Sequence, residues 1–129
     1  MDILEQTSPN GLQITACNGS ECIINANTMT ESFILFNNQI IPWPVKNISD
    51  INAQNLQMII DLKPDCVIFG TGINFHFLEA EQLQTLINAQ IGYECMKSST
   101  ACGSFQLIAG DGREVLAAIL LEKSEEDIS

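Results

Sequence analysis

The sequence predicts an α/β fold in a single domain. The chain has 129 residues, which is the size of one ordinary domain. Short β-like runs fill residues 12–41, and strand-like and helix-like runs alternate over residues 65–121. Because no linker or internal repeat divides the chain, we expect one domain over residues 1–121 and an acidic, solvated tail at residues 122–129.

The N-terminal part is expected to form antiparallel strands. Runs rich in β-branched and aromatic residues alternate with the turn dipeptides Asn18-Gly19 and Asn37-Asn38. Strands are predicted at residues 12–16, 21–26, 32–36 and 39–41. Pro42-Trp43-Pro44 ends this meander, because neither proline can donate a hydrogen bond to a sheet ladder.

The rest of the chain predicts alternating helices and strands. Asn52 can cap a helix over residues 53–62, which Pro64 ends. The continuous apolar run at residues 65–70 suits a strand buried on both faces. The remaining predicted elements are a helix at 78–90, a strand at 93–96, a helix at 99–110 and a strand at 113–122. This order predicts a βαβ unit followed by a further helix and strand.

Charge and hydropathy exclude several classes of function. Five Lys and Arg residues against sixteen Asp and Glu residues leave a formal charge of -11, which repels phosphate backbones at long range. We therefore expect no nucleic-acid partner. No run approaches the roughly 20 apolar residues that span a bilayer, and no basic segment precedes an apolar one at the start. We expect no membrane insertion and a cytoplasmic location.

The cysteines predict free thiols in a reducing compartment. There are five of them, an odd number, without a C-x-x-C motif, and most lie inside apolar runs where a small thiol packs well. They are Cys17, Cys22, Cys66, Cys95 and Cys102. We expect no metal site and no cofactor.

A candidate ligand crevice follows from the ends of two predicted parallel strands. In open α/β sheets, ligands bind outside the carboxyl ends of such strands, where a helix N-terminus offers free N–H groups to an anion. The candidate residues are Gly70, Thr71, Gly72, Lys97, Ser98, Ser99, Thr100 and Cys102. The alternative is that Gly70 and Gly72 only permit positive φ and a close chain crossing, because the third glycine of a dinucleotide fingerprint is absent.

Two further residues carry open alternatives. Cys102 is either a thiol activated by the helix N-terminus and Lys97, or a small buried core residue. Trp43 is either an exposed interaction anchor held between two prolines, or a core residue that covers a sheet edge. No complete catalytic set is found in the sequence, so no catalytic residue is predicted.

The chain resembles the Mth-938-like domain family of unknown function. The resemblance rests on "PDCVIFGTG", "FLEAEQLQTLINAQIGYECM" and "STACGSFQLIAGDGREVLAAIL", and it covers nearly the whole chain. The residues at family motif positions are Gly70, Thr71, Gly72, Cys102, Gly112 and Arg113. Ser104-Phe105-Gln106 differs from the family's usual Thr-Tyr-Asn, and Ile73-Asn74-Phe75-His76 replaces a loop that is often basic.

The resemblance implies a compact three-layer fold with a mixed central sheet, N-terminal antiparallel strands and a C-terminal βαβαβ segment. The family includes a mitochondrial respiratory complex I assembly factor and an adipogenesis-associated protein, and it implies no reaction. We therefore predict a non-catalytic protein-interaction or assembly-factor-like module with a protein partner. The alternative is a small-molecule or anion-binding protein, or an enzyme, that uses the crevice. A homodimer is a further alternative.

Overall fold

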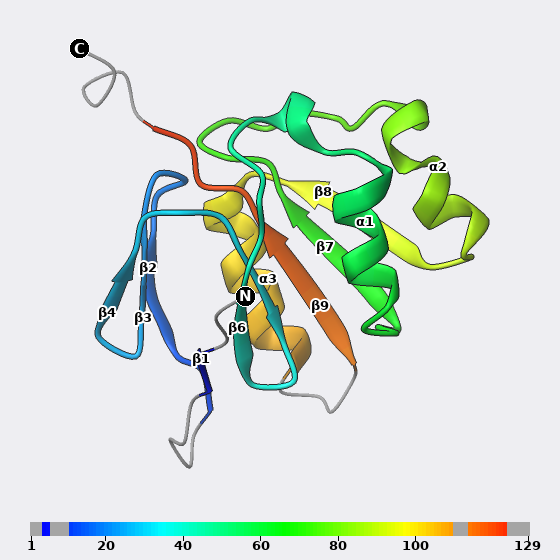
Figure 1. Cartoon of the computed structure of the whole chain (residues 1–129). Helices are drawn as coiled ribbons and strands as arrows, with labels where there is room; N and C mark the ends of the chain where they lie inside the picture. The colour runs from blue at the N-terminus through cyan, green and yellow to red at the C-terminus, as the bar shows by residue number, and fades with distance from the viewer. Residues whose placement is uncertain (1–3, 6–10, 110–113, 124–129) are drawn as a thin grey trace.

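The computed structural model describes residues 4–5, 11–109 and 114–123. Most of the strands form a six-stranded mixed sheet with the order β1-β6-β5-β9-β7-β8. These strands are β1 (Leu4–Glu5), β5 (Phe33–Phe36), β6 (Gln39–Pro42), β7 (Cys66–Gly70), β8 (Gly92–Met96) and β9 (Val115–Ile119). β7 runs parallel to both β8 and β9, whereas β9 pairs antiparallel with β5. Figure 1 shows β9 beside β7.

A second sheet holds the first strands of the chain. Its order is β2-β3-β4, and both pairs are antiparallel. The strands are β2 (Ile14–Cys17), β3 (Cys22–Ile24) and β4 (Asn27–Met29). The helices are α1 (Ala53–Ile60), α2 (Ala80–Asn88), α3 (Ser98–Ala109) and a short 3₁₀ helix at Ile48–Asp50.

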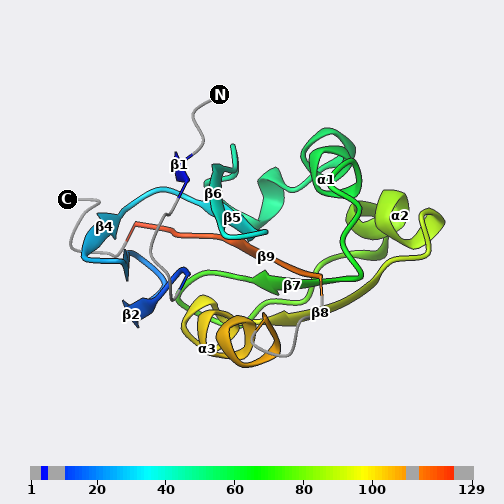
Figure 2. The same cartoon turned by 90° about the horizontal axis from the view of Figure 1, so that it is seen from below.

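The elements form three layers around the six-stranded sheet. Figure 2 shows α1 and α2 on one face of this sheet and α3 on the other. The small sheet packs on the same side as α3, because Cys22 and Ile24 share a core cluster with Phe105. The predicted α/β fold, with its mixed central sheet and three layers, is confirmed.

Alternating side chains of the central strands build a core on each face. In β5, Ile34 and Phe36 point toward α1 and α2, whereas Phe33 and Leu35 point toward α3 and the small sheet. All five residues of β9 are buried, as expected for a strand with neighbours on both sides and layers on both faces. The middle layer is therefore the hydrophobic centre of the molecule.

Local signals explain where the helices start and end. The Asn52 side chain accepts a hydrogen bond from the Asn55 N–H (3.0 Å), and the Asn55 side chain accepts one from the Asn52 N–H (2.9 Å), which caps α1. α1 ends at Ile60, two residues earlier than predicted, and the chain then turns at Lys63, whose φ is +57°. α2 is also shorter than the predicted 78–90.

The main correction to the predicted strands concerns residues 21–29. One strand was expected over residues 21–26, but the chain turns at Asn25 and Ala26, both with positive φ, and β4 follows. β2, β3 and β4 form a separate sheet, whereas β5 and β6 belong to the central sheet. Gly112 and Arg113, two of the family motif positions, lie outside the described residues.

Candidate functional site

The two loops of the predicted crevice do lie side by side. β7 and β8 are neighbours, with Gly70 paired to Met96 at their carboxyl ends. The Thr71 N–H donates to the Met96 carbonyl oxygen (2.8 Å), and the Ser98 N–H donates to the Gly72 carbonyl oxygen (2.9 Å). These hydrogen bonds join the glycine loop directly to the start of α3.

Ser98 is the polar centre of this junction. Its side chain is fully buried, its Oγ accepts from the Gly72 N–H (2.9 Å), and the same hydroxyl donates to the Leu120 carbonyl oxygen (2.6 Å). The N–H groups of Gly72 and Ser98 therefore already have partners inside the protein, whereas the predicted anion contacts, Lys97 and the N–H groups around Ser99 and Thr100, stay a prediction. Ser99 is half-buried, and Lys97 and Thr100 are exposed.

The two glycines serve different geometric needs. Gly72 has a φ of +102°, in the left-handed region that side chains resist. Gly70 does not have positive φ, but a Cβ there would lie 2.9 Å from the Ser98 Cα, so the chains cross too closely for a side chain. The alternative role predicted for these glycines was to permit positive φ and a close chain crossing; Gly72 has the positive φ and Gly70 lies at the close crossing.

The turn between β2 and β3 also joins this junction. Gly19 has a φ of +89°, and a Cβ there would lie 2.6 Å from the Ile73 Cα. The Gly19 carbonyl oxygen accepts from the Glu122 N–H (3.0 Å), and the Glu122 carboxylate accepts from the Ile73 N–H (2.8 Å). The junction therefore connects the small sheet to the carboxyl ends of the central strands.

Cys102 is a buried thiol and not an activated one. It is 2% exposed, and burial raises its pKa to about 12. Of the two alternatives for Cys102, the structure therefore favours the small buried core residue over the thiol activated by the helix N-terminus and Lys97. The Cys102 Sγ lies 3.7 Å from the Cys22 Sγ, on the side of α3 that faces the small sheet.

The prediction that all five cysteines are free thiols is also wrong. Cys17 and Cys22 stand directly opposite each other on β2 and β3 and form a disulfide. Cys66 and Cys95 are free and half-buried, and burial raises the pKa of the Cys95 thiol. The pairing places two oxidised sulfurs beside Cys102.

Trp43 is a core residue, which is the second of its two predicted alternatives, and the candidate role as an exposed interaction anchor is corrected. Its side chain is 3% exposed and lies 6.3 Å from Phe69 between ring centroids. Its indole N–H donates to the Asn55 carbonyl oxygen of α1 (3.3 Å). The flanking prolines hold the indole against the core and not toward solvent.

The loop after β7 presents an aromatic pair that sequence reasoning did not assign to a surface. Phe75 is 45% exposed and Phe77 is 81% exposed. Their rings pack edge to face, with 4.6 Å between the ring centroids. Thr71 holds this loop: its buried hydroxyl donates to the Asn74 carbonyl oxygen (2.9 Å) and accepts from the His76 N–H (3.1 Å). The alternating Phe-His-Phe pattern was the available signal, since neighbours on both sides of one residue share a face in extended chain.

Hydrogen bonds therefore join the loop after β7 to the start of α3 and to the end of β9. The polar groups at the ends of β7 and β8 hydrogen-bond to one another, and the exposed residues nearby include Lys97, Thr100 and residues 74–77. None of the described helices has the length and apolar character needed to cross a membrane.

Similar proteins with curated names include assembly factors. The human protein "NADH dehydrogenase [ubiquinone] 1 alpha subcomplex assembly factor 3" is 24% identical over 122 residues, which cover 93% of this chain and 66% of that protein. Its Danio rerio counterpart is 26% identical over 122 residues, covering 93% of this chain and 70% of that protein. The chain thus spans about two thirds of the length of these relatives.

Solved structures share the fold. A Xanthomonas campestris protein matches with a TM-score of 0.79 and 23% identity, covering 90% of each chain. A Bordetella pertussis protein described as a Mth938-like domain matches with a TM-score of 0.76 and 21% identity, covering 100% of this chain and 98% of that one. The family described as "Protein of unknown function (DUF498/DUF598)" matches residues 14–120. This chain therefore belongs to the DUF498/DUF598 family and has the Mth938-like fold.

Proposed function

We propose that this chain is a non-catalytic protein-interaction module in the cytoplasm, and that Phe75 and Phe77 lie at the centre of its contact surface. The observation that carries the proposal is the exposure of two adjoining aromatic side chains, 45% for Phe75 and 81% for Phe77, whose rings contact each other. The names of the curated relatives, which are assembly factors, support a role exercised through protein contacts.

The loop is suited to binding because it is already held in one shape. The Thr71 hydroxyl makes two hydrogen bonds to the loop backbone, and the two rings pack against each other. A preorganised loop loses less conformational entropy when a partner covers it. Fully burying an exposed phenylalanine contributes about 1.5–3 kcal/mol. Phe77, at 81% exposed, can gain most of this on binding, whereas Phe75, at 45% exposed, can gain about half.

The chemistry of the surface indicates the kind of partner. Residues 73–77 carry no acidic or strongly basic side chain, whereas the whole chain has a formal charge of -11. A fitting partner offers an apolar pocket for the rings, with basic residues around it that speed association.

The test is quantitative affinity capture from the source cells, with the wild-type chain compared to a Phe75→Ser/Phe77→Ser variant. We expect the variant to keep its melting temperature and to lose at least one partner by tenfold or more. Leu107→Ser is the matched control, since Leu107 is 78% exposed but lies toward the far end of α3. Light scattering of both variants tests whether the partner is a second copy of the chain.

The proposal fails if the double phenylalanine variant retains every partner of the wild-type chain. It also fails if Leu107→Ser loses the same partners to the same extent, because the effect would then be one of general surface hydrophobicity.

The alternative function, binding of an anion or small molecule beside Lys97, stays a prediction with less support. The N–H groups of Gly72 and Ser98 already donate within the protein. A phosphate titration at low salt, followed by NMR, tests it: Lys97→Ala should abolish shifts at Ser99 and Thr100 if a site exists.

A further inference from the structure

A row of sulfur-containing side chains crosses the small sheet. Cys17 stands directly opposite Cys22, and Cys22 stands directly opposite Met29. Residues directly opposite each other in neighbouring strands share a face of the sheet. Cys22 is fully buried, and Cys17 and Met29 are half-buried against the same core cluster.

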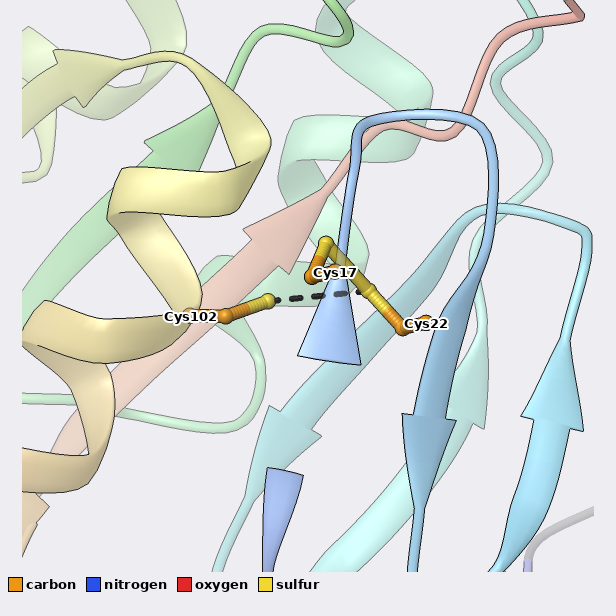
Figure 3. A group of neighbouring side chains, drawn as sticks. All are labelled: Cys17, Cys22 and Cys102. Atoms are coloured by element: carbon orange, nitrogen blue, oxygen red, sulfur yellow. Dashed lines mark hydrogen bonds between the residues drawn. A yellow bond between two sulfur atoms is a disulfide. The ribbon is translucent and has the colours of Figure 1, made fainter. Parts of the chain in front are cut away.

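α3 adds another sulfur to this face. Cys102 projects from α3 toward the row, and its Sγ lies 3.7 Å from the Cys22 Sγ, as Figure 3 shows. The Sγ atoms of Cys17, Cys22 and Cys102 all lie within 4.8 Å of one another. Three cysteines from three separate elements thus converge on one point between the small sheet and the helix.

We propose that, when the Cys17–Cys22 disulfide is reduced, Cys17, Cys22 and Cys102 form a three-thiolate site that binds one Cu(I) ion. The reductant is a dithiol: it is oxidised to its own disulfide, and its two electrons and two protons convert the Cys17–Cys22 bond into two thiols. Cu(I) then replaces the protons of the three thiols, which are released to water, and no electron moves in this second step.

The spacing of the sulfurs fits a trigonal site. A metal–thiolate bond is about 2.3 Å long, so three sulfurs around one ion lie about 4 Å apart. The observed 3.7 Å between the Cys22 and Cys102 sulfurs is close to this value. The Cys17 sulfur lies within 4.8 Å of both, and it separates from the Cys22 sulfur when their disulfide is reduced. α3 and the small sheet therefore need no large movement to surround an ion once the disulfide opens.

The donor set selects Cu(I) over Zn(II). Structural zinc sites have four ligands from cysteine, histidine or carboxylate side chains. In the part of the chain that the structure describes, no histidine, aspartate, glutamate or fourth cysteine joins this group. Thiolates bind both ions, but three ligands are one fewer than a structural zinc site uses, whereas the soft Cu(I) ion also suits the thioether that the neighbouring Met29 adds to the same face.

The burial of the site suits an ion that must be protected from oxidation. Cys22 is 0% exposed and Cys102 is 2% exposed, among apolar neighbours such as Ile24 and Phe105. Cys17 is only half-buried, so the reductant can reach the disulfide and the ion can reach the three thiols from this side. An apolar shell around a metal limits the access of water to it.

The test is an anaerobic titration of the reduced whole chain with Cu(I), in competition with the chromogenic chelator bicinchoninate. We expect one Cu(I) per chain, and no binding by the chain with its disulfide intact. Cys17→Ala and Cys102→Ala should each weaken Cu(I) binding by about 100-fold or more. Removing a residue that only hydrogen-bonds to a metal ligand typically weakens binding by about 10–100-fold. Cys17 is half-buried, so its variant stays informative if Cys102→Ala unfolds the protein.

A Cys66→Ser/Cys95→Ser variant is the matched control, because these two thiols are also partly buried but lie outside the cluster. It should bind Cu(I) as the wild-type chain does. Equal loss in this control, equal binding by the oxidised chain, or displacement of Cu(I) by equimolar Zn(II) would overturn the assignment.

Discussion

Replacing Ser98 with alanine should destabilise the protein more than any other serine-to-alanine change in the described chain. The Ser98 hydroxyl accepts a hydrogen bond from the Gly72 N–H and donates one to the Leu120 carbonyl oxygen. All three residues are buried, so water cannot replace the missing hydroxyl. Ser98→Ala therefore leaves one buried donor and one buried acceptor without a partner.

The magnitude follows from these two groups. Each buried polar group left without a hydrogen bond costs about 1–3 kcal/mol. Alanine avoids the cost of burying the hydroxyl itself and the loop can relax slightly, so we expect a loss of about 2–4 kcal/mol in the free energy of unfolding. For a domain with a total stability of about 5–15 kcal/mol, this is a large share.

Urea denaturation followed by tryptophan fluorescence measures this change, because Trp43 is the sole indole and is buried. Ser104→Ala is the control, since Ser104 lies on the same helix but is only half-buried. If the two variants unfold with the same dependence of free energy on urea concentration, the difference between their urea midpoints reports a difference in stability. A Ser98→Ala variant within 0.5 kcal/mol of the control would refute the view that this hydroxyl holds the loops together.

Three further outcomes are expected. Gly72→Ala should cost about 1 kcal/mol or more, measured by urea denaturation, because alanine resists a φ of +102°; unchanged stability would contradict this. Trp43→Ala should cost about 3–5 kcal/mol yet leave partner capture intact, since the indole is 3% exposed; retained stability with lost capture would restore the anchor. The free energy of unfolding should fall as pH rises from 9 toward 12. The Cys102 thiol has a pKa of about 12 in the folded protein and 9.0 in the unfolded chain, so in this range the unfolded chain loses the proton first. Cys102→Ala should flatten this part of the pH profile.

The sequence predicted the elements that obey local rules. β7 was expected at residues 65–70 and is observed at Cys66–Gly70, because a continuous apolar run bounded by Pro64 and a glycine has few other solutions. α1 starts where Asn52 predicts it, since its capping contacts involve only the next three residues. Local hydrogen bonds and hydrophobic periodicity are visible in sequence.

Interactions between distant segments were not predictable in the same way. β9 enters the sheet between β5 and β7, a choice that depends on pairing over most of the chain. The turn at Asn25-Ala26 was missed because alanine at its second position is not a turn signal, although both residues have positive φ, which asparagine tolerates and alanine resists. Pattern rules for turns therefore divided the strands incorrectly in this region.

The candidate sites show the same limit. Cys22 and Cys102 meet across a separation of 80 residues, and no sequence spacing encodes this contact. Gly70, Thr71 and Ser98 were identified as neighbours through the rule on parallel strand ends, but the rule does not tell whether their polar groups face a ligand or each other. Burial, which decided the roles of Cys102 and Trp43, is a property of the assembled layers.

The central position of β9 also sets the order of events during synthesis of the chain. All four side chains of β5 are buried, yet its neighbour β9 comes from the other end of the described chain. The Leu121 N–H, just after β9, donates a hydrogen bond to the hydroxyl of Ser32, just before β5, and these two residues are 89 residues apart. At about 5–20 residues per second, translation takes roughly 4–18 s to cover that separation. For this time the apolar β5–β6 hairpin emerges from the ribosome with an open edge, so nascent chains stalled before residue 115 should be the species that chaperones bind and that aggregate.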